Sequence, residues 1–136
     1  MTKPKHNPIL NAYLPPQFRQ IRVALAREPG HPDGDDEVAY IFAAPLDTEG
    51  RIDSKLWAAH RVACWVARQR PNEADRLGYL VHHPGGAWGF HYDDDTNLPD
   101  DVGYHFADER FIVGEYVSIN ENGKMHTYRV TTVSHV

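Results

Sequence analysis

Hydrophobic and polar residues alternate along the first part of the chain, from residue 20 to residue 46, as they do in strands with one buried face. The alternating apolar residues form two sets: Ile21, Val23 and Leu25, followed by Val38, Tyr40 and Phe42. The stretch between the sets, from Pro29 to Asp36, is rich in proline, glycine and aspartate, which is typical of turns. Residues 20–46 are therefore predicted to form a β-hairpin with a long acidic loop.

One later stretch has the features of a helix. Asp53-Ser54 offers an N-cap, and from Leu56 neither glycine nor proline occurs until Pro71. We therefore predict one main helix over residues 54–70.

Glycine-containing turns predict two further hairpins. If Gly85-Gly86 are the central residues of the first turn, His83 faces Trp88 across the strands and Val81 faces Phe90. A turn one residue longer would move the side chains of one strand to the other face.

The second of these turns is Asn122-Gly123, the preferred pair for a type I′ turn. Counting outward from it places Ile119 opposite His126 and Val117 opposite Tyr128, on a face expected to be buried.

Three hairpins and one helix predict an α+β fold. We expect an antiparallel sheet of about five to seven strands, which could curl towards a small barrel, packed against the helix at residues 54–70. The length of 136 residues fits one domain, so residues 17–136 are predicted to form it. Residues 1–16 look like a proline-rich tail that docks on the domain through its apolar residues, namely Ile9, Leu10, Tyr13 and Leu14.

Charge is distributed unevenly along the chain. The net charge is −5, which disfavours general nucleic-acid binding, because such proteins present a basic surface to phosphates. Residues 30–50 and 77–109 contain acidic residues and no lysine or arginine. Residues 51–76 carry six basic and three acidic residues. The predicted helix is therefore the place to look for a partner surface.

The sequence also bears on the cellular compartment. Cys64 is the only cysteine, so an internal disulfide is excluded and a reducing compartment is the simpler interpretation. The proline-rich N-terminus has no secretory pattern, and no apolar run approaches the roughly 20 residues that cross a bilayer. We expect a cytoplasmic protein without a membrane segment.

The first candidate site is Arg61, Trp65 and Arg68, which share the outer face of the predicted helix. An indole between two guanidinium groups suits a protein partner or a second copy of the chain, which is our leading hypothesis. The same group could instead bind an anionic ligand or single-stranded nucleic acid, by stacking and charge pairing. Packing of this group within the chain, with the arginines paired to the acidic loops, is the simplest alternative.

A second candidate is a divalent metal site. His82 and His91 share one face in the predicted register, near Asp93 and Asp95, and imidazole and carboxylate are common metal ligands. Such a site would support a metal-assisted enzyme, whereas solvated histidines are the alternative. No other cofactor is predicted. The acidic loop from Asp93 lacks the glycine and glutamate that a helix-flanked calcium loop needs.

Two further groups have simpler structural explanations. The aromatic residues Trp88, Phe90 and Tyr128, together with His126, could line a ligand pocket, although sheet faces normally bury such residues. Cys64 lies one helical turn from His60 in the prediction but in an apolar setting, which disfavours a reactive thiolate. No established catalytic motif occurs, so binding is preferred over catalysis.

Overall fold

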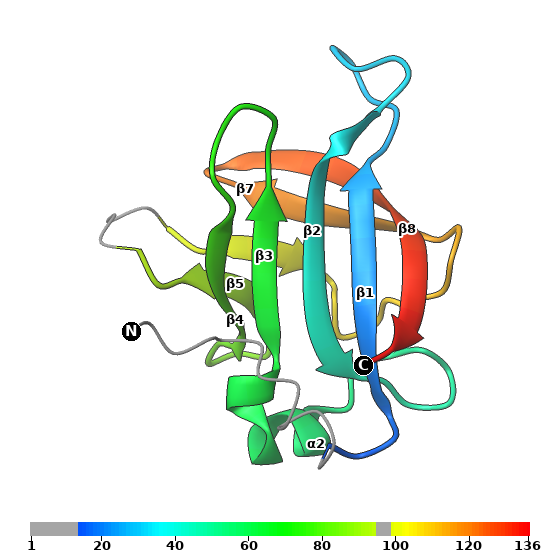
Figure 1. Cartoon of the computed structure of the whole chain (residues 1–136), viewed down its shortest axis with the longest axis vertical. Coiled ribbons are helices and arrows are strands. Elements are labelled where there is room, and N and C mark those ends of the chain that lie inside the picture. Colours follow the sequence, from blue (N-terminus) through cyan, green and yellow to red (C-terminus); the bar gives the residue numbers. More distant parts are fainter. Residues whose placement is uncertain (1–13, 95–98) are drawn as a thin grey trace.

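The structure is a computed structural model that describes residues 14–94 and 99–136, and its strands form a closed antiparallel barrel (Figure 1). Each strand pairs with the next along the chain, and β8 pairs with β1 to close the barrel. The eight strands are β1 (Phe18–Leu25), β2 (Asp35–Pro45), β3 (Trp65–Gln69), β4 (Arg76–His82), β5 (Trp88–Tyr92), β6 (Asp101–Tyr104), β7 (Tyr116–Glu121) and β8 (Lys124–His135).

The predicted α+β class with a main helix at residues 54–70 is wrong. The helix α2 covers only Ser54–Ala59, a short 3₁₀ turn η1 follows at Arg61–Ala63, and β3 begins at Trp65. The N-cap was correctly placed, because the Asp53 carboxylate accepts hydrogen bonds from the backbone N–H groups of Lys55 and Leu56. Beyond the cap, pairing of β3 with β2 and β4 outweighs a helix propensity that is weak for valine, cysteine and tryptophan.

All three predicted hairpins form, and the predicted register is confirmed at the Asn122-Gly123 turn. In β1–β2, Ile21 pairs with Phe42 and Val23 pairs with Tyr40, and all four side chains are buried. In β7–β8 the register from the Asn122-Gly123 turn is the predicted one: Val117 pairs with Tyr128 and Ile119 with His126.

The β4–β5 hairpin differs from the favoured prediction by one residue. His82 pairs with Trp88 and Leu80 pairs with Phe90, because the turn starts at His83, whose N–H donates to the carbonyl oxygen of Ala87 at 2.7 Å. The side chains of β4 are therefore turned over, and His82 shares the inner face with Trp88.

Aromatic side chains fill the barrel interior towards the end that carries α2. Phe42 contacts both Phe90 and Phe111 with ring centroids 5.2 and 5.6 Å apart, and Phe106 contacts Phe90 and Phe111. The Trp57 ring of α2 lies edge-on to Trp88 at 5.1 Å, and its indole N–H donates to the carbonyl oxygen of Leu80. The short helix therefore closes one end of the barrel.

The other end carries the connections β1–β2, β3–β4 and β7–β8 and is called the mouth below (Figure 1). Alternating antiparallel strands put these three connections at one end and α2 at the opposite end. Among the residues that the structure describes, no helix is long and apolar enough to span a membrane.

The predicted docking of the tail falls largely on residues 1–13, which lie outside the described residues. Leu14, the first residue described, is partly buried and packs against the core.

Candidate ligand site at the barrel mouth

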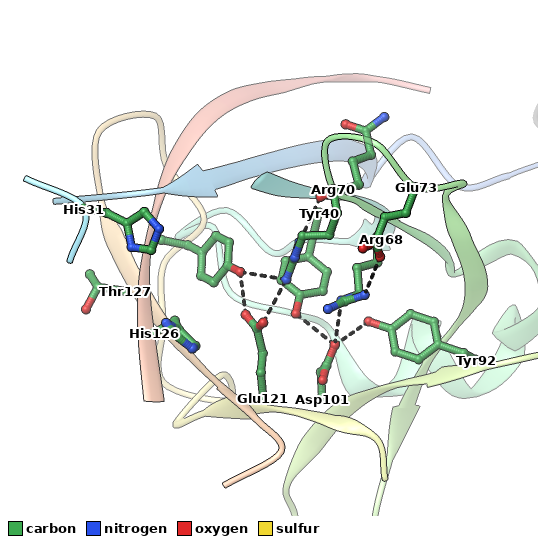
Figure 2. A network of polar contacts seen from close by, with 12 residues as sticks. His31, Tyr40, Arg68, Arg70, Glu73, Tyr92, Asp101, Glu121, His126 and Thr127 are labelled. Atoms are coloured by element: carbon green, nitrogen blue, oxygen red, sulfur yellow. Dashed lines mark hydrogen bonds and ion pairs between the residues drawn. The ribbon is translucent and has the colours of Figure 1, made fainter. Parts of the chain in front are cut away.

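Polar side chains from six strands converge inside the mouth (Figure 2). They belong to Tyr40, Arg68, Arg70, Tyr92, Asp101, Glu121 and Tyr128. Strand pairing explains the convergence. Arg68 pairs with Tyr40, and each lies two residues from a member of the buried pair Phe42 and Val66, so all four side chains point to the same face of the sheet. Below this level the inner face is apolar, and at the mouth it becomes charged.

Asp101 is the centre of one half of this group. Its Oδ2 atom accepts hydrogen bonds from the hydroxyls of Tyr40 at 2.8 Å and Tyr92 at 2.6 Å. Among the residues that the structure describes, Asp101 is the one charged residue that is buried. Its two phenol donors compensate for its loss of hydration.

Glu121 is the centre of the other half. Its Oε1 atom accepts a hydrogen bond from Arg70 at 2.8 Å, and its Oε2 atom accepts a short one from the Tyr128 hydroxyl. Arg70 also donates to the Tyr128 oxygen at 3.1 Å, and its guanidinium lies 5.3 Å from the centre of the Tyr40 ring. Arg70 thereby joins the two halves.

The three phenols are held in their protonated form. Burial, and then the nearby Asp101 and Glu121 carboxylates, raise the pKa values of Tyr40, Tyr92 and Tyr128 above the ordinary value of 10.0. At neutral pH these groups are therefore hydrogen-bond donors rather than general bases.

Arg70 is held in its charged form. Burial works against the charge, but Tyr128, Tyr40 and Glu121 outweigh it and raise the pKa of Arg70. This arginine is committed to its partners within the chain.

Arg68 is held much less tightly than its neighbours. Its closest carboxylate atoms are Glu73 Oε1 at 3.5 Å and Asp101 Oδ2 at 3.7 Å. Its Nε atom is buried and has no hydrogen-bond partner, and it is the one such side-chain atom found in the described part of the chain. Arg76, by contrast, donates from Nε to Asp94 at 2.8 Å and lies over the Tyr92 ring.

Glu28 forms a separate polar cluster with His126 and Thr127, both of which are labelled in Figure 2. The Glu28 carboxylate lies 2.9 Å from His126 Nδ1 and accepts the backbone N–H of Thr127 at 3.1 Å. Burial acts to raise the pKa of Glu28, but these contacts outweigh it and the pKa is lowered. The loop after β1 is thereby fastened to the start of β8.

The predicted group Arg61, Trp65 and Arg68 is not brought together. Arg61 lies in η1 near the closed end, with its guanidinium 4.7 Å from the centre of the Trp57 ring. Trp65 and Arg68 are three residues apart on β3, so they point to opposite faces of the sheet. The group depended on a helix that the fold replaces with a strand, and only Arg68 belongs to the mouth.

The predicted metal group is not assembled either. His82 is on the inner face, where its ring stacks on Trp88 at 4.0 Å, whereas His91 is on the outer face. Asp93 follows β5, and Asp95 lies outside the described residues. In residues 14–94 and 99–136 there is no group of three or more metal-ligand side chains that could hold an ion.

His91 instead shares a carboxylate with His83. Asp100 Oδ1 lies 2.7 Å from His91 Nδ1, and Asp100 Oδ2 lies 3.2 Å from His83 Nε2. The two adjacent aspartates at the start of β6 therefore have different roles, because Asp100 contacts histidines and Asp101 lies in the mouth.

The remaining predicted residues lie mostly in the core. Trp88, Phe90 and Tyr128 are buried members of the core cluster, whereas His126 is half-buried against Glu28. They belong to different levels of the barrel: Tyr128 is part of the polar network at the mouth, whereas His126 pairs with Glu28. Cys64 is fully buried, and burial raises the pKa of its thiol to about 12, so it is a poor nucleophile.

The sequence interpretation missed Tyr92, Asp101 and Glu121 as members of a site. One signal was available: Tyr40 and Tyr128 were both predicted on buried faces, and a buried phenol needs a hydrogen-bond partner. The identity of those partners depends on strand order, which the sequence did not provide.

The fold and the site define a closed antiparallel β-barrel with a polar network in its mouth. No protein family model matches the sequence, and no match was found among curated proteins or solved structures.

Proposed function

We propose that this protein binds a small organic carboxylate at the mouth of the barrel, with Arg68 as the principal contact. The observation that carries the proposal is the buried Arg68 Nε–H, which has no hydrogen-bond partner. A buried donor without a partner costs about 1–3 kcal/mol, and a charge-assisted hydrogen bond to a ligand oxygen would remove that cost.

The neighbouring arginines support this assignment by contrast. Arg70 and Arg76 each have a carboxylate oxygen at 2.8 Å, whereas the nearest one to Arg68 is at 3.5 Å. A ligand that pairs with Arg70 or Arg76 would have to break a good ion pair, and a ligand that pairs with Arg68 would not.

Glu73 suggests how a ligand carboxylate reaches Arg68. Its side chain lies on the β3–β4 turn, is 55% exposed and approaches Arg68 at the long distance of 3.5 Å. An exposed pair of this kind contributes little free energy, so a ligand carboxylate can replace Glu73 at small cost. The ligand would bind at the rim, where solvent already reaches Glu73.

The architecture is consistent with such a role, because eight-stranded barrels are just wide enough to fill with side chains or to hold one small ligand. The hydroxyls of Tyr40 and Tyr92 already donate to Asp101, so the Arg68 guanidinium is the donor group left for an acceptor-rich ligand. Binding rather than catalysis is proposed because all three phenols keep their protons at neutral pH.

The test is to follow the arginine Nε–H resonances by NMR while acetate and then benzoate are added, with benzamide and sodium chloride as controls. Such small probes bind weakly, so a dissociation constant of about 1 mM is expected. The Arg68 resonance should shift and saturate with the carboxylates only. Arg70 and Arg76 should stay in place.

Matched variants sharpen this test. Arg68→Gln should abolish the carboxylate-dependent shifts of neighbouring backbone amides. Arg76→Gln should leave the dissociation constant for the carboxylate within about threefold of its value in the unmodified protein, because Arg76 is already paired. The proposal is rejected if the Arg68 resonance does not move, if every arginine moves together, or if both variants behave alike.

A further inference from the structure

Two neighbouring apolar clefts lie at the opposite end of the barrel, around η1. The first, of about 240 Å³, is lined by Trp57, Arg61, Val62 and the β4 residues 79–82. The second, of about 440 Å³, is lined by Leu14 and residues 58–63. Arg61 and Val62 line both clefts and form the ridge between them.

Val62 on this ridge is unusually exposed for an apolar residue. The Val62 side chain is 72% exposed, the highest value among the large hydrophobic residues described as exposed. An exposed valine flanked by two apolar clefts is typical of an interaction surface rather than of a solvated turn.

The charge around this ridge is positive. The residues that line the two clefts include one arginine, Arg61, and no lysine, aspartate or glutamate. Lys55 on α2 is exposed one helical turn before Ala58 and Ala59 of the second cleft. In a chain of net charge −5, this is a local basic and apolar surface.

Arg61 has no ion pair with a carboxylate among the residues that the structure describes. Its guanidinium lies 4.7 Å from the centre of the Trp57 ring, and that ring is fixed by the hydrogen bond from its N–H to Leu80. The Arg61 guanidinium is therefore held in place, and its N–H groups can donate hydrogen bonds to a carboxylate of a partner.

We infer that the η1 ridge and its two clefts dock an acidic segment of a partner protein, with one apolar side chain in each cleft and a carboxylate on Arg61. Charge complementarity favours an acidic partner. A second copy of this chain seated face to face on the ridge would bring the two Arg61 side chains and the two Lys55 side chains together, which opposes self-association there. The inference concerns the end of the barrel opposite Arg68 and does not depend on carboxylate binding at the mouth.

The test uses fluorescein-labelled peptides in which two leucines flank a pair of glutamates, with binding to the full chain followed by fluorescence anisotropy. Two comparison peptides replace glutamate with lysine or leucine with serine. The glutamate–leucine peptide should bind at least about tenfold more tightly than either, and its affinity should fall as salt is added.

Matched variants locate the binding. Val62→Asp should weaken it at least about tenfold, whereas Val113→Asp should not, because Val113 is also exposed, at 56%, but lies outside both clefts. Arg61→Glu should reverse the preference towards the lysine peptide. Far-ultraviolet circular dichroism would establish that each variant is folded.

The inference is overturned if the lysine peptide binds the unmodified protein equally well, or if Val62→Asp and Val113→Asp have the same effect. It is also overturned if sedimentation shows a dimer that Val62→Asp dissociates, because the occupant is then a second copy. Loss of carboxylate binding in Arg68→Gln with unchanged peptide binding would separate this surface from the mouth.

Discussion

Burial decides the chemistry of the single thiol. Cys64 is fully enclosed, its Sγ lies 3.5 Å from the carbonyl oxygen of His60, and burial raises its pKa from 9.0 to about 12. The contact with His60 therefore involves the backbone oxygen of that residue, so it does not form the nucleophile and base pair that their spacing suggested.

The thiol should react slowly in the folded protein. A rise of three pKa units leaves about a thousandfold less thiolate at any pH below the ordinary value. Iodoacetamide at pH 8 should therefore modify Cys64 at least about a thousandfold more slowly in the native protein than in urea, as mass spectrometry would measure. Equal rates would show that the thiol is accessible.

The two adjacent aspartates offer a second prediction at this scale. Asp101→Asn removes the charge that accepts hydrogen bonds from two buried tyrosines, so we expect the free energy of unfolding to fall by about 2–4 kcal/mol. Asp100→Asn changes a carboxylate whose partners, His83 and His91, are both accessible to solvent. It should lower the free energy of unfolding by less than about 1 kcal/mol. Urea unfolding of both variants measures the difference, and equal losses would contradict it.

Strand pairing, rather than local propensity, determines the elements around the barrel. Gly78 on β4 illustrates this, because a Cβ atom at that position would lie 1.9 Å from the carbonyl oxygen of His91 on β5. The two strands can approach this closely only because residue 78 has no side chain.

Gly78→Ala should therefore disrupt the β4–β5 pairing and lower the free energy of unfolding by about 2–4 kcal/mol. The neighbouring substitution Leu77→Ala is the control and should cost less than about 1 kcal/mol, because Leu77 is exposed. Thermal unfolding with hydrogen exchange at β5 would measure both. A Gly78→Ala protein as stable as Leu77→Ala would show that the close approach is unimportant.

The contact between the loop after β1 and the start of β8 should depend on pH. The pKa of Glu28 is lowered in the folded protein from its ordinary value of 4.5, so its ionised form stabilises the fold. That contribution is complete above about pH 4.5 and is lost as the pH falls through the lower folded value.

Glu28→Gln should therefore lower the free energy of unfolding by about 1–2 kcal/mol at pH 7, and the difference from the unmodified protein should shrink below pH 4.5. Glu37→Gln, at an exposed position on β2, should change stability by less than about 0.5 kcal/mol at either pH. Urea titrations at several pH values provide the measurement. A difference that grows on acidification would contradict the assigned sign.

At the scale of the whole molecule, the barrel depends on one long-range seam. β1 and β8 lie at opposite ends of the described chain, and their pairing joins Arg19 to His135 and Arg22 to Thr132. Closure removes the free strand edges that an open sheet would expose.

Deleting residues 132–136 should open this seam. The amides of β1 should lose protection from hydrogen exchange, and the free energy of unfolding should fall by more than about 3 kcal/mol, because four residue pairs and the Val133 contact with the core are lost. Deleting only Val136, which is exposed, should have little effect. Unchanged protection of β1 in the longer deletion would show that closure does not support the fold.

Local sequence patterns placed some residues of the mouth correctly and others wrongly. The positions of Tyr40 and Tyr128 on buried faces followed from two-residue alternation and from the Asn122-Gly123 turn. The helix prediction placed Trp65 and Arg68 on one face, and the strand places them on opposite faces. The absence of glycine and proline from residues 56–69 permits either structure, so only the neighbouring strands could decide between them.

The sequence by itself determined the features that depend on neighbours along the chain: the N-cap at Asp53, the hairpin at residues 20–46, the hairpin register at the Asn122-Gly123 turn and the uneven charge. The tertiary structure alone decided the barrel closure, the strand identity of residues 65–69, the partners of the buried tyrosines and the loose pairing of Arg68. The physical reason is that capping and turn geometry act over a few residues. Strand order and burial of charge depend instead on contacts between segments far apart in the sequence.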